Sequence, residues 1–160
     1  MNHINKKFFL FIAVLGVATL SLMSCKKDKK GPSISAAELA VLENLVGTWS
    51  LTTVTQDDGP VQVGDYSSLT LIVNGSLSDG SGKTYSVANG GPALPSVTEA
   101  SWSFVDGSNF GVIEREDGVL MRINSVTATT LVLQQDVEDE IETGGRVASI
   151  GRYIYTFTAQ

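Results

Sequence analysis

The sequence has very little of the side-chain chemistry that most enzymes use. It contains one histidine, His3, and one cysteine, Cys25, among 160 residues. If the first 24 residues are removed, no histidine remains, which excludes Ser-His-Asp and Cys-His catalysis and every metal site with a histidine ligand. A lone cysteine also excludes a disulfide within the chain. The composition therefore predicts a protein that is not an enzyme and that uses no cofactor or metal.

Basic residues are scarce as well. The chain has 11 Lys and Arg against 17 Asp and Glu, a net charge of −6. From residue 45 onward, five basic residues face 14 acidic ones. A strongly acidic surface repels the phosphate backbone of nucleic acids, so we expect no nucleic-acid partner. Nucleotide binding has no support either, because no glycine-rich loop follows a strand and opens a helix.

The N-terminus has the pattern of an export signal. Positive residues precede an apolar or small run of 15 residues at 8–22, which is too short to span a membrane as a helix and suits a signal peptide. Leu22-Met-Ser-Cys25 follows and resembles the lipobox of bacterial lipoproteins. The resemblance implies that residues 1–24 are removed and that acyl chains on Cys25 anchor the protein in a membrane. The alternative is a plain secretory signal with a chance cysteine.

Residues 25–34 read as a lipidated tether in front of the folded part. Four lysines lie within residues 26–30, where they either attract anionic lipid head groups or form a solvated linker. Lys26 stands where lipoproteins retained at the inner membrane of Gram-negative bacteria have aspartate. The resemblance therefore implies the outer membrane, with either its periplasmic or its surface face.

A short helix is expected at the start of the folded domain, which we place at residues 35–160. Ser35-Ala-Ala-Glu38 has the form of a capping box, in which the Ser35 hydroxyl accepts from the Glu38 amide and Glu38 reaches back. Leucines then recur at three- and four-residue steps. The pattern predicts an amphipathic helix over 36–45 that ends at Gly47.

After Gly47 the apolar period changes from helical to two, which is typical of half-buried strands. Asp-Gly and Asn-Gly turns between the segments, such as Asn74-Gly75 and Asp117-Gly118, favour antiparallel hairpins. Eight such strands close into a barrel that has no exposed edge. We therefore predict an all-β fold, an up-and-down antiparallel barrel of eight strands preceded by one helix. The expected strands are 49–55, 69–74, 84–88, 100–105, 110–115, 119–124, 130–134 and 153–158.

The start of the first strand carries a family resemblance. Gly47-Thr-Trp49, placed after a short helix and before a run of strands, resembles the Gly-x-Trp motif of lipocalins. With the lipobox, it makes the chain similar to the lipocalin-like domains of Gram-negative envelope lipoproteins. The resemblance implies that Trp49 plugs one end of the barrel beneath the helix. The chain departs from lipocalins in lacking their Thr-Asp-Tyr motif and an arginine after the last strand.

The barrel interior is the first candidate functional site. An eight-stranded barrel is either filled by its own side chains or holds one small ligand. The first case predicts a structural or protein-interaction lipoprotein with an unknown partner, and the second a binding module for a small hydrophobic molecule. The residues expected to point inward are Trp49, Leu51, Leu69, Leu71, Val73, Val87, Trp102, Phe104, Val112, Met121, Ile123, Leu131, Leu133, Tyr155 and Phe157. Those expected to line a ligand are Leu71, Trp102, Phe104, Met121, Leu133, Tyr155 and Phe157.

Two loops add further candidates. The long loop around Gly90–Pro95 is either a lid or an exposed contact site: Leu94 over the barrel mouth would favour a ligand, and an outward Leu94 a protein partner. The acidic stretch 136–145 offers carboxylates that suit Ca²⁺, although Ile141 stands where an EF-hand loop has glycine. The alternative is a solvated hairpin, which we favour.

Overall fold

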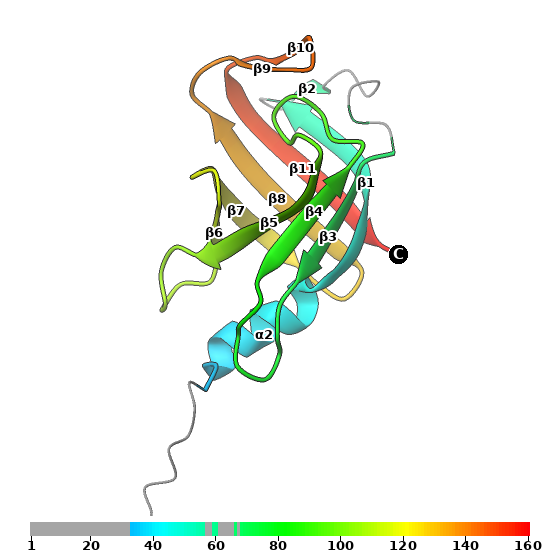
Figure 1. The fold of residues 1–160 in the computed structure, drawn as a ribbon. Helices are drawn as coiled ribbons and strands as arrows, with labels where there is room; N and C mark the ends of the chain where they lie inside the picture. Colours follow the sequence, from blue (N-terminus) through cyan, green and yellow to red (C-terminus); the bar gives the residue numbers. More distant parts are fainter. Residues whose placement is uncertain (1–32, 57–58, 61–65, 67) are drawn as a thin grey trace, which may run out of the picture. The chain divides into compact units, whose positions relative to one another are not determined.

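The computed structural model describes residues 33–56, 66 and 68–160, and the backbone of 59–60 (Figure 1). The chain divides into two compact units, Met1–Gly31 and Pro32–Gln160, and the second holds every residue described below. The expected signal peptide, Cys25 and most of the tether lie outside the described residues. The described part contains no helix that is long and apolar enough to span a bilayer.

The helix α2 (Ala36–Leu45) has the predicted bounds. Ser35 caps it, since its hydroxyl accepts from the Glu38 amide at 3.0 Å. The carboxylate of Glu38, however, does not complete the capping box. It lies 2.8 Å from the ammonium of Lys83 instead, so this side chain ties the helix to the barrel rather than to its own cap.

Eight antiparallel strands form a closed barrel behind the helix. Each strand pairs with the next along the chain, and the last pairs with the first, which closes the sheet (Figure 1). The predicted fold is confirmed: an all-β, up-and-down, eight-stranded barrel with one helix in front. Its strands are β1 (Gly47–Gln56), β3 (Thr70–Asn74), β4 (Thr84–Ala88), β5 (Val97–Phe104), β6 (Val112–Arg115), β7 (Leu120–Val126), β8 (Thr130–Val137) and β11 (Gly151–Ala159).

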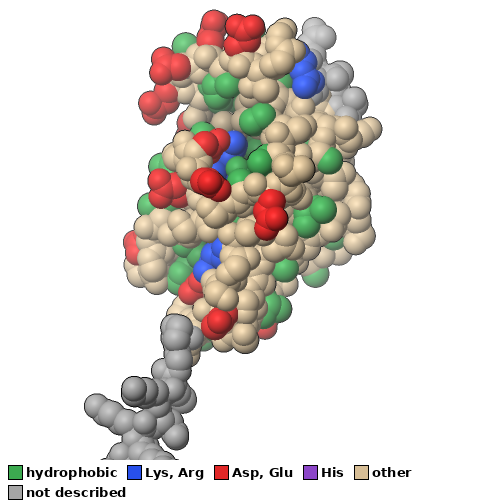
Figure 2. Space-filling view, viewed as in Figure 1, with side chains coloured by type: hydrophobic (Ala, Val, Ile, Leu, Met, Phe, Trp, Pro, Cys, Tyr) green, Lys and Arg blue, Asp and Glu red, His purple; other side chains and the backbone are tan. Residues whose placement is uncertain are grey.

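Three short strands lie outside the barrel wall. The two residues of β2 (Gly59–Pro60) pair with the end of β1. The acidic stretch forms a hairpin of β9 (Ile141–Thr143) and β10 (Arg146–Ala148), and Gly144 and Gly145 at its turn have φ of 60° and 75°, which suits glycine. Acidic side chains gather at this end of the molecule (Figure 2). The described residues contain no cluster of ligands for a metal ion.

A bulge changes which residues of β1 face the core. Trp49 and Leu51 share one face, yet Leu51 is only half-buried and the next buried residue is Val54. The register against β11 shifts between Leu51 and Thr53. One extra residue in a strand reverses the face of every side chain after it, so the inward set of β1 is Trp49 and Leu51, which packs against the core opposite Phe157, and then Val54.

On β6 the predicted inward residue was wrong. Val112 is half-buried, whereas Ile113 and Arg115 are buried. The pairing with β5 sets this phase, because Ile113 lies opposite Phe104 and Arg115 lies opposite Trp102. Residues that are directly opposite in an antiparallel pair point to the same side. A basic residue therefore takes the inward position next to Trp102.

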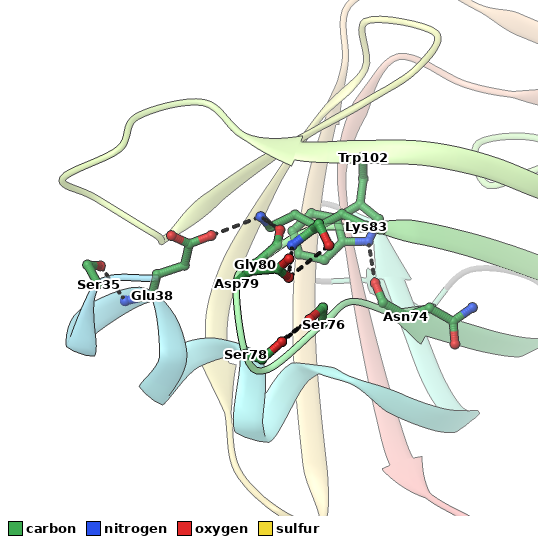
Figure 3. A network of polar contacts seen from close by, with 10 residues as sticks. Ser35, Glu38, Asn74, Ser76, Ser78, Asp79, Gly80, Lys83 and Trp102 are labelled. Carbon is green, nitrogen blue, oxygen red and sulfur yellow. Dashed lines mark hydrogen bonds and ion pairs between the residues drawn. The ribbon is translucent and has the colours of Figure 1, made fainter. Parts of the chain in front are cut away.

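The helix closes one end of the barrel. Trp49 is buried, and its indole nitrogen donates to the carbonyl of Leu45 at 3.0 Å. Lys83 completes the closure from the loop between β3 and β4: it binds Glu38 and the carbonyl of Gly80 (Figure 3), and its ammonium lies 6.0 Å from the ring centre of Trp102. A Cβ on Gly47 would lie 3.7 Å from the Trp49 indole, an ordinary contact, so space alone does not require glycine there.

Candidate functional site

A small cavity lies inside the barrel. Its volume is about 20 Å³, which is room for about one water molecule. Leu45 of α2 and Leu94 of the loop between β4 and β5 both contribute to its wall. Side chains from six strands form the rest, and all but two of them are apolar: Leu71, Val73, Tyr85, Trp102, Ile113, Arg115, Met121 and Leu133.

The structure places the seven candidate ligand-lining residues in two groups. Leu71, Trp102, Met121 and Leu133 line the cavity. The other three do not line it. Tyr155 and Phe157 are fully buried neighbours on β11, with ring centres 6.3 Å apart. Phe104 is half-buried and lies edge-on to Trp102 at 5.1 Å.

The loop at residues 89–96 is a buried plug rather than an exposed contact site. Its residues from Gly90 to Leu94 are all buried, and Leu94 is only 1% exposed. Leu94 faces the cavity from the end of β4, and α2 lies at the opposite end of the barrel (Figure 1). A Leu94 that lies over the barrel mouth favours a ligand over a protein partner.

Polar contacts hold this plug in place. Within the loop, the Gly90 amide donates to the Ser96 hydroxyl at 2.8 Å. Across the barrel mouth, the Ala93 amide donates to the Tyr66 hydroxyl at 3.3 Å, and the Arg146 guanidinium of β10 donates to the Gly90 carbonyl at 3.1 Å. The hairpin of β9 and β10 thus clamps the loop from outside.

Arg115 brings a charge into the barrel. It is 6% exposed, and a buried charge requires partners because its transfer out of water is costly. Its Nε donates to the Tyr85 hydroxyl at 3.1 Å, and its Nη2 lies 2.5 Å from a carboxylate oxygen of Asp117. Its Nη1 has no hydrogen-bond partner among the described residues.

Two more buried polar groups lie on β8 and β11. Gln135 on β8 is buried, and its side-chain oxygen lacks a partner among the described residues. Burial raises the pKa of the Tyr155 hydroxyl well above its usual value; the hydroxyls of Tyr66 and Tyr153 add to this rise, and Arg115 opposes it. The Tyr155 hydroxyl therefore stays protonated and neutral at any physiological pH.

Sequence reasoning missed Arg115 and Tyr85 as cavity residues. Arg115 reads as a solvent-facing residue because basic side chains are seldom buried. The alternation along the strand could have identified it. Ile113 and Arg115 alternate with Val112 and Glu114, so Arg115 points inward if Ile113 does. Leu94 lies in a loop, and nothing in its spacing along the sequence predicts its burial.

No protein-family model, curated protein or solved structure matches the chain. Function must therefore be inferred from the residues around the cavity. Those residues form an apolar chamber with a plug at one end, and the chamber as it stands has room for about one water molecule.

Proposed function

We propose that this protein is a lipid-anchored lipoprotein of the cell envelope, in the outer membrane, whose lipocalin-like barrel binds a small hydrophobic molecule and catalyses no reaction. The observation that carries the proposal is the apolar cavity beneath Leu94, lined by Leu71, Trp102, Met121 and Leu133. Ligand sites are concave, mostly apolar and have a few placed polar groups. Tyr85 and Arg115 are the two wall residues whose side chains carry polar groups.

Binding would require the plug to move. A cavity of about 20 Å³ holds no organic ligand, so Leu94 must leave its place for an apolar chain to enter. Hydrogen bonds to loop and hairpin residues and the burial of Leu94 in the core hold the plug, whereas a strand ladder does not. Each hydrogen bond contributes about 1 kcal/mol and a buried leucine about 1.5–3 kcal/mol, so the plug can leave without breaking a strand pairing of the barrel.

The anchor rests on the lipobox-like Leu22-Met-Ser-Cys25. Several acyl chains on one residue would hold the protein stably, because each buried methylene contributes about 0.8 kcal/mol and two chains already suffice. Cys25→Ser should abolish incorporation of a labelled fatty acid in a Gram-negative host. Ser24→Ala, which keeps a small residue before the cysteine, should retain the label. Labelling of Cys25→Ser would contradict the anchor.

Native mass spectrometry of the lipidated protein, purified from the host envelope, tests the ligand. We expect an adduct of a few hundred daltons that organic extraction removes. Leu94→Trp, which adds bulk to the plug, should reduce the adduct. Leu120→Trp is the control, because Leu120 is exposed on β7. Equal adducts in both variants would mean that the molecule binds elsewhere.

The alternative is a structural or interaction lipoprotein with a filled barrel. The specific observation in its favour is the same small volume, since side chains occupy nearly all of the interior. In that case the purified protein carries no adduct with or without extraction. The outer loops would then contact a protein partner, and the plug would serve only to complete the core.

A further inference from the structure

The wall of the barrel splits between β7 and β8. The pairing of these two strands stops where Arg122 lies opposite Gln134. Beyond this pair, β7 extends to Leu120 and β8 extends to Val137, and β8 stays paired with β11 on its other side. Among the described residues, no strand pairs with 135–137 on the side of β7. An unpaired strand edge presents backbone N–H and C=O groups with which another strand can pair.

A groove lies at this split. Its volume is about 510 Å³, which falls within the range of about 300–1,000 Å³ that is usual for binding pockets. The turn before β7 lines one part of it, and the end of β8 with the segment that follows lines another. None of the described residues lines both this groove and the cavity inside the barrel, so the groove is a separate candidate site.

Most charged residues of the groove are acidic. Asp136, Glu138 and Asp139 line it, and Arg122 is the one basic residue among the described part of its lining. Asp136 lies 3.2 Å from Arg152 of β11. Glu138 and Asp139, in contrast, are exposed and have no ion pair among the described residues. The acidic side chains that gather at this end (Figure 2) attract basic partners and repel acidic ones.

We propose that the groove binds an extended segment of a partner protein in which apolar and basic residues alternate, and that this segment pairs with the free edge of β8. A segment that adds a strand to a sheet gains affinity from main-chain hydrogen bonds and specificity from its alternate side chains. Every second side chain of an added strand faces the core, where Met121 and Val137 flank the split and are buried. The remaining side chains face outward, toward the carboxylates. Such a surface adds a partner-binding role to the proposed ligand site and does not depend on it.

A second copy of this chain does not fit the groove. From residue 45 onward the chain has five basic residues against 14 acidic ones, so a copy brings further negative charge to an acidic groove. Charged residues beside an exposed strand edge commonly prevent such self-association. The same charges that exclude a copy favour a basic segment, because specificity rests on repulsion of the wrong partner as well as attraction of the right one.

Three labelled peptides test the pairing by fluorescence anisotropy. The first, acetylated and amidated Lys-Val-Lys-Val-Lys-Val-Lys, has the proposed alternation. The second has glutamate in place of lysine, and the third is the first with N-methyl groups on its interior amides. The full chain would be held in phosphatidylcholine nanodiscs, with empty nanodiscs as the blank. We expect the first peptide to bind at least about tenfold more tightly than either of the others, because the second loses the charge attraction and the third the main-chain donors.

A double variant tests the charge of the groove. Glu138→Gln with Asp139→Asn should weaken binding of the lysine peptide by about tenfold, since two exposed carboxylates are lost. The matched control is Glu43→Gln with Glu99→Gln. It changes the net charge by the same amount at exposed residues that do not line the groove, so it should leave the affinity unchanged.

Hydrogen exchange locates the bound peptide, because the backbone amides of 135–137 should exchange more slowly in the complex. Four results would each overturn the strand pairing: no binding of the lysine peptide, equal binding of its N-methylated form, equal losses in the two double variants, or unchanged exchange at 135–137. None of these results bears on the small-molecule adduct in native mass spectrometry, so the proposed function stands or falls separately.

Discussion

The two ends of the barrel are closed in different ways. At the helix end, α2 leads directly into β1, and a buried tryptophan and a partly buried ion pair fasten it. At the opposite end, a loop enters the mouth and is held by hydrogen bonds to Tyr66 and to β10. Both closures bury apolar side chains in the core, but the first continues into a strand of the wall, whereas the second is a loop between two strands. The helix end should therefore stay closed under conditions in which the loop end opens.

The largest effect is expected at the helix end. Trp49→Ala should lower the free energy of unfolding by about 3–5 kcal/mol, as for other buried aromatic residues. Denaturant melts measure this, and Leu120→Ala, at a residue 51% exposed, should cost less than about 0.5 kcal/mol. A loss below about 1 kcal/mol at Trp49 would show that the tryptophan does not plug the barrel.

At the loop end, Leu94→Ala should cost less, about 2–3 kcal/mol. Leucine truncations in a core cost about 2–5 kcal/mol, and the cost falls where the site can collapse. The same variant enlarges the cavity and should therefore strengthen binding of an apolar ligand. If Leu94→Ala cost as much as Trp49→Ala, the two closures would be equally integral to the core.

Gly91→Ala probes how closely the plug packs. A Cβ at Gly91 would lie 2.2 Å from the Tyr66 ring, so the loop must shift, and overpacking of this kind costs about 1–3 kcal/mol. Gly107→Ala is the matched control, since a Cβ there meets nothing within 4 Å. Equal free energies of unfolding for the two variants in denaturant melts would mean that the loop does not pack against Tyr66.

The ion pair at the helix end should contribute about 1 kcal/mol. Both side chains of Lys83 and Glu38 are mostly buried, which places the pair at the upper end of the range for surface ion pairs. A double-mutant cycle with Lys83→Gln and Glu38→Gln isolates this contribution, which should shrink as salt is added. A coupling energy of zero would mean that burial of Leu42, Leu45 and Trp49 holds α2 without help from the ion pair.

The smallest effect is a pH dependence in the loop beside the helix. The pKa of Asp79 is lowered to about 2 by the hydroxyl of Ser76, with further bonds from the hydroxyl and amide of Ser81. Because the folded pKa lies below the unfolded value near 3.8, the stabilisation is present above about pH 4 and is lost as pH falls toward 2. The free energy of unfolding of Asp79→Asn, measured as the pH is lowered from about 4 to about 2, should not show this small loss. A variant with the same pH dependence as the original chain would contradict the prediction.

Much of the fold could be predicted from the sequence, because the signals were local. Alternation of apolar and polar residues defines strands, as in segment 153–158, without knowledge of the strands they pair with. Asn-Gly and Asp-Gly turns define hairpins in the same local way. The face of a short strand is different. On β6 the pairing with Trp102 and Phe104 decides that Ile113 and Arg115 point inward, and pairing is not visible in a single segment.

The candidate site was predictable only in part, for the same reason. Leu71, Trp102, Met121 and Leu133 lie at regular inward positions of strong strands, so alternation found them. Leu94 lies in a loop, where exposure is the ordinary expectation, and its burial depends on Tyr66 and the β9–β10 hairpin. The bulge in β1 likewise broke a pattern that alternation alone would have continued from Leu51 to Thr53.

The wall of the barrel also has a seam. β5 and β6 share three residue pairs, from Trp102–Arg115 to Phe104–Ile113, whereas β8 and β11 share eight. Local openings of a native protein begin where the fewest backbone hydrogen bonds must break. Amide protons of β6 should therefore exchange with deuterated water well before those of β11. We therefore expect the strand that carries Arg115 to be the first part of the barrel wall to open.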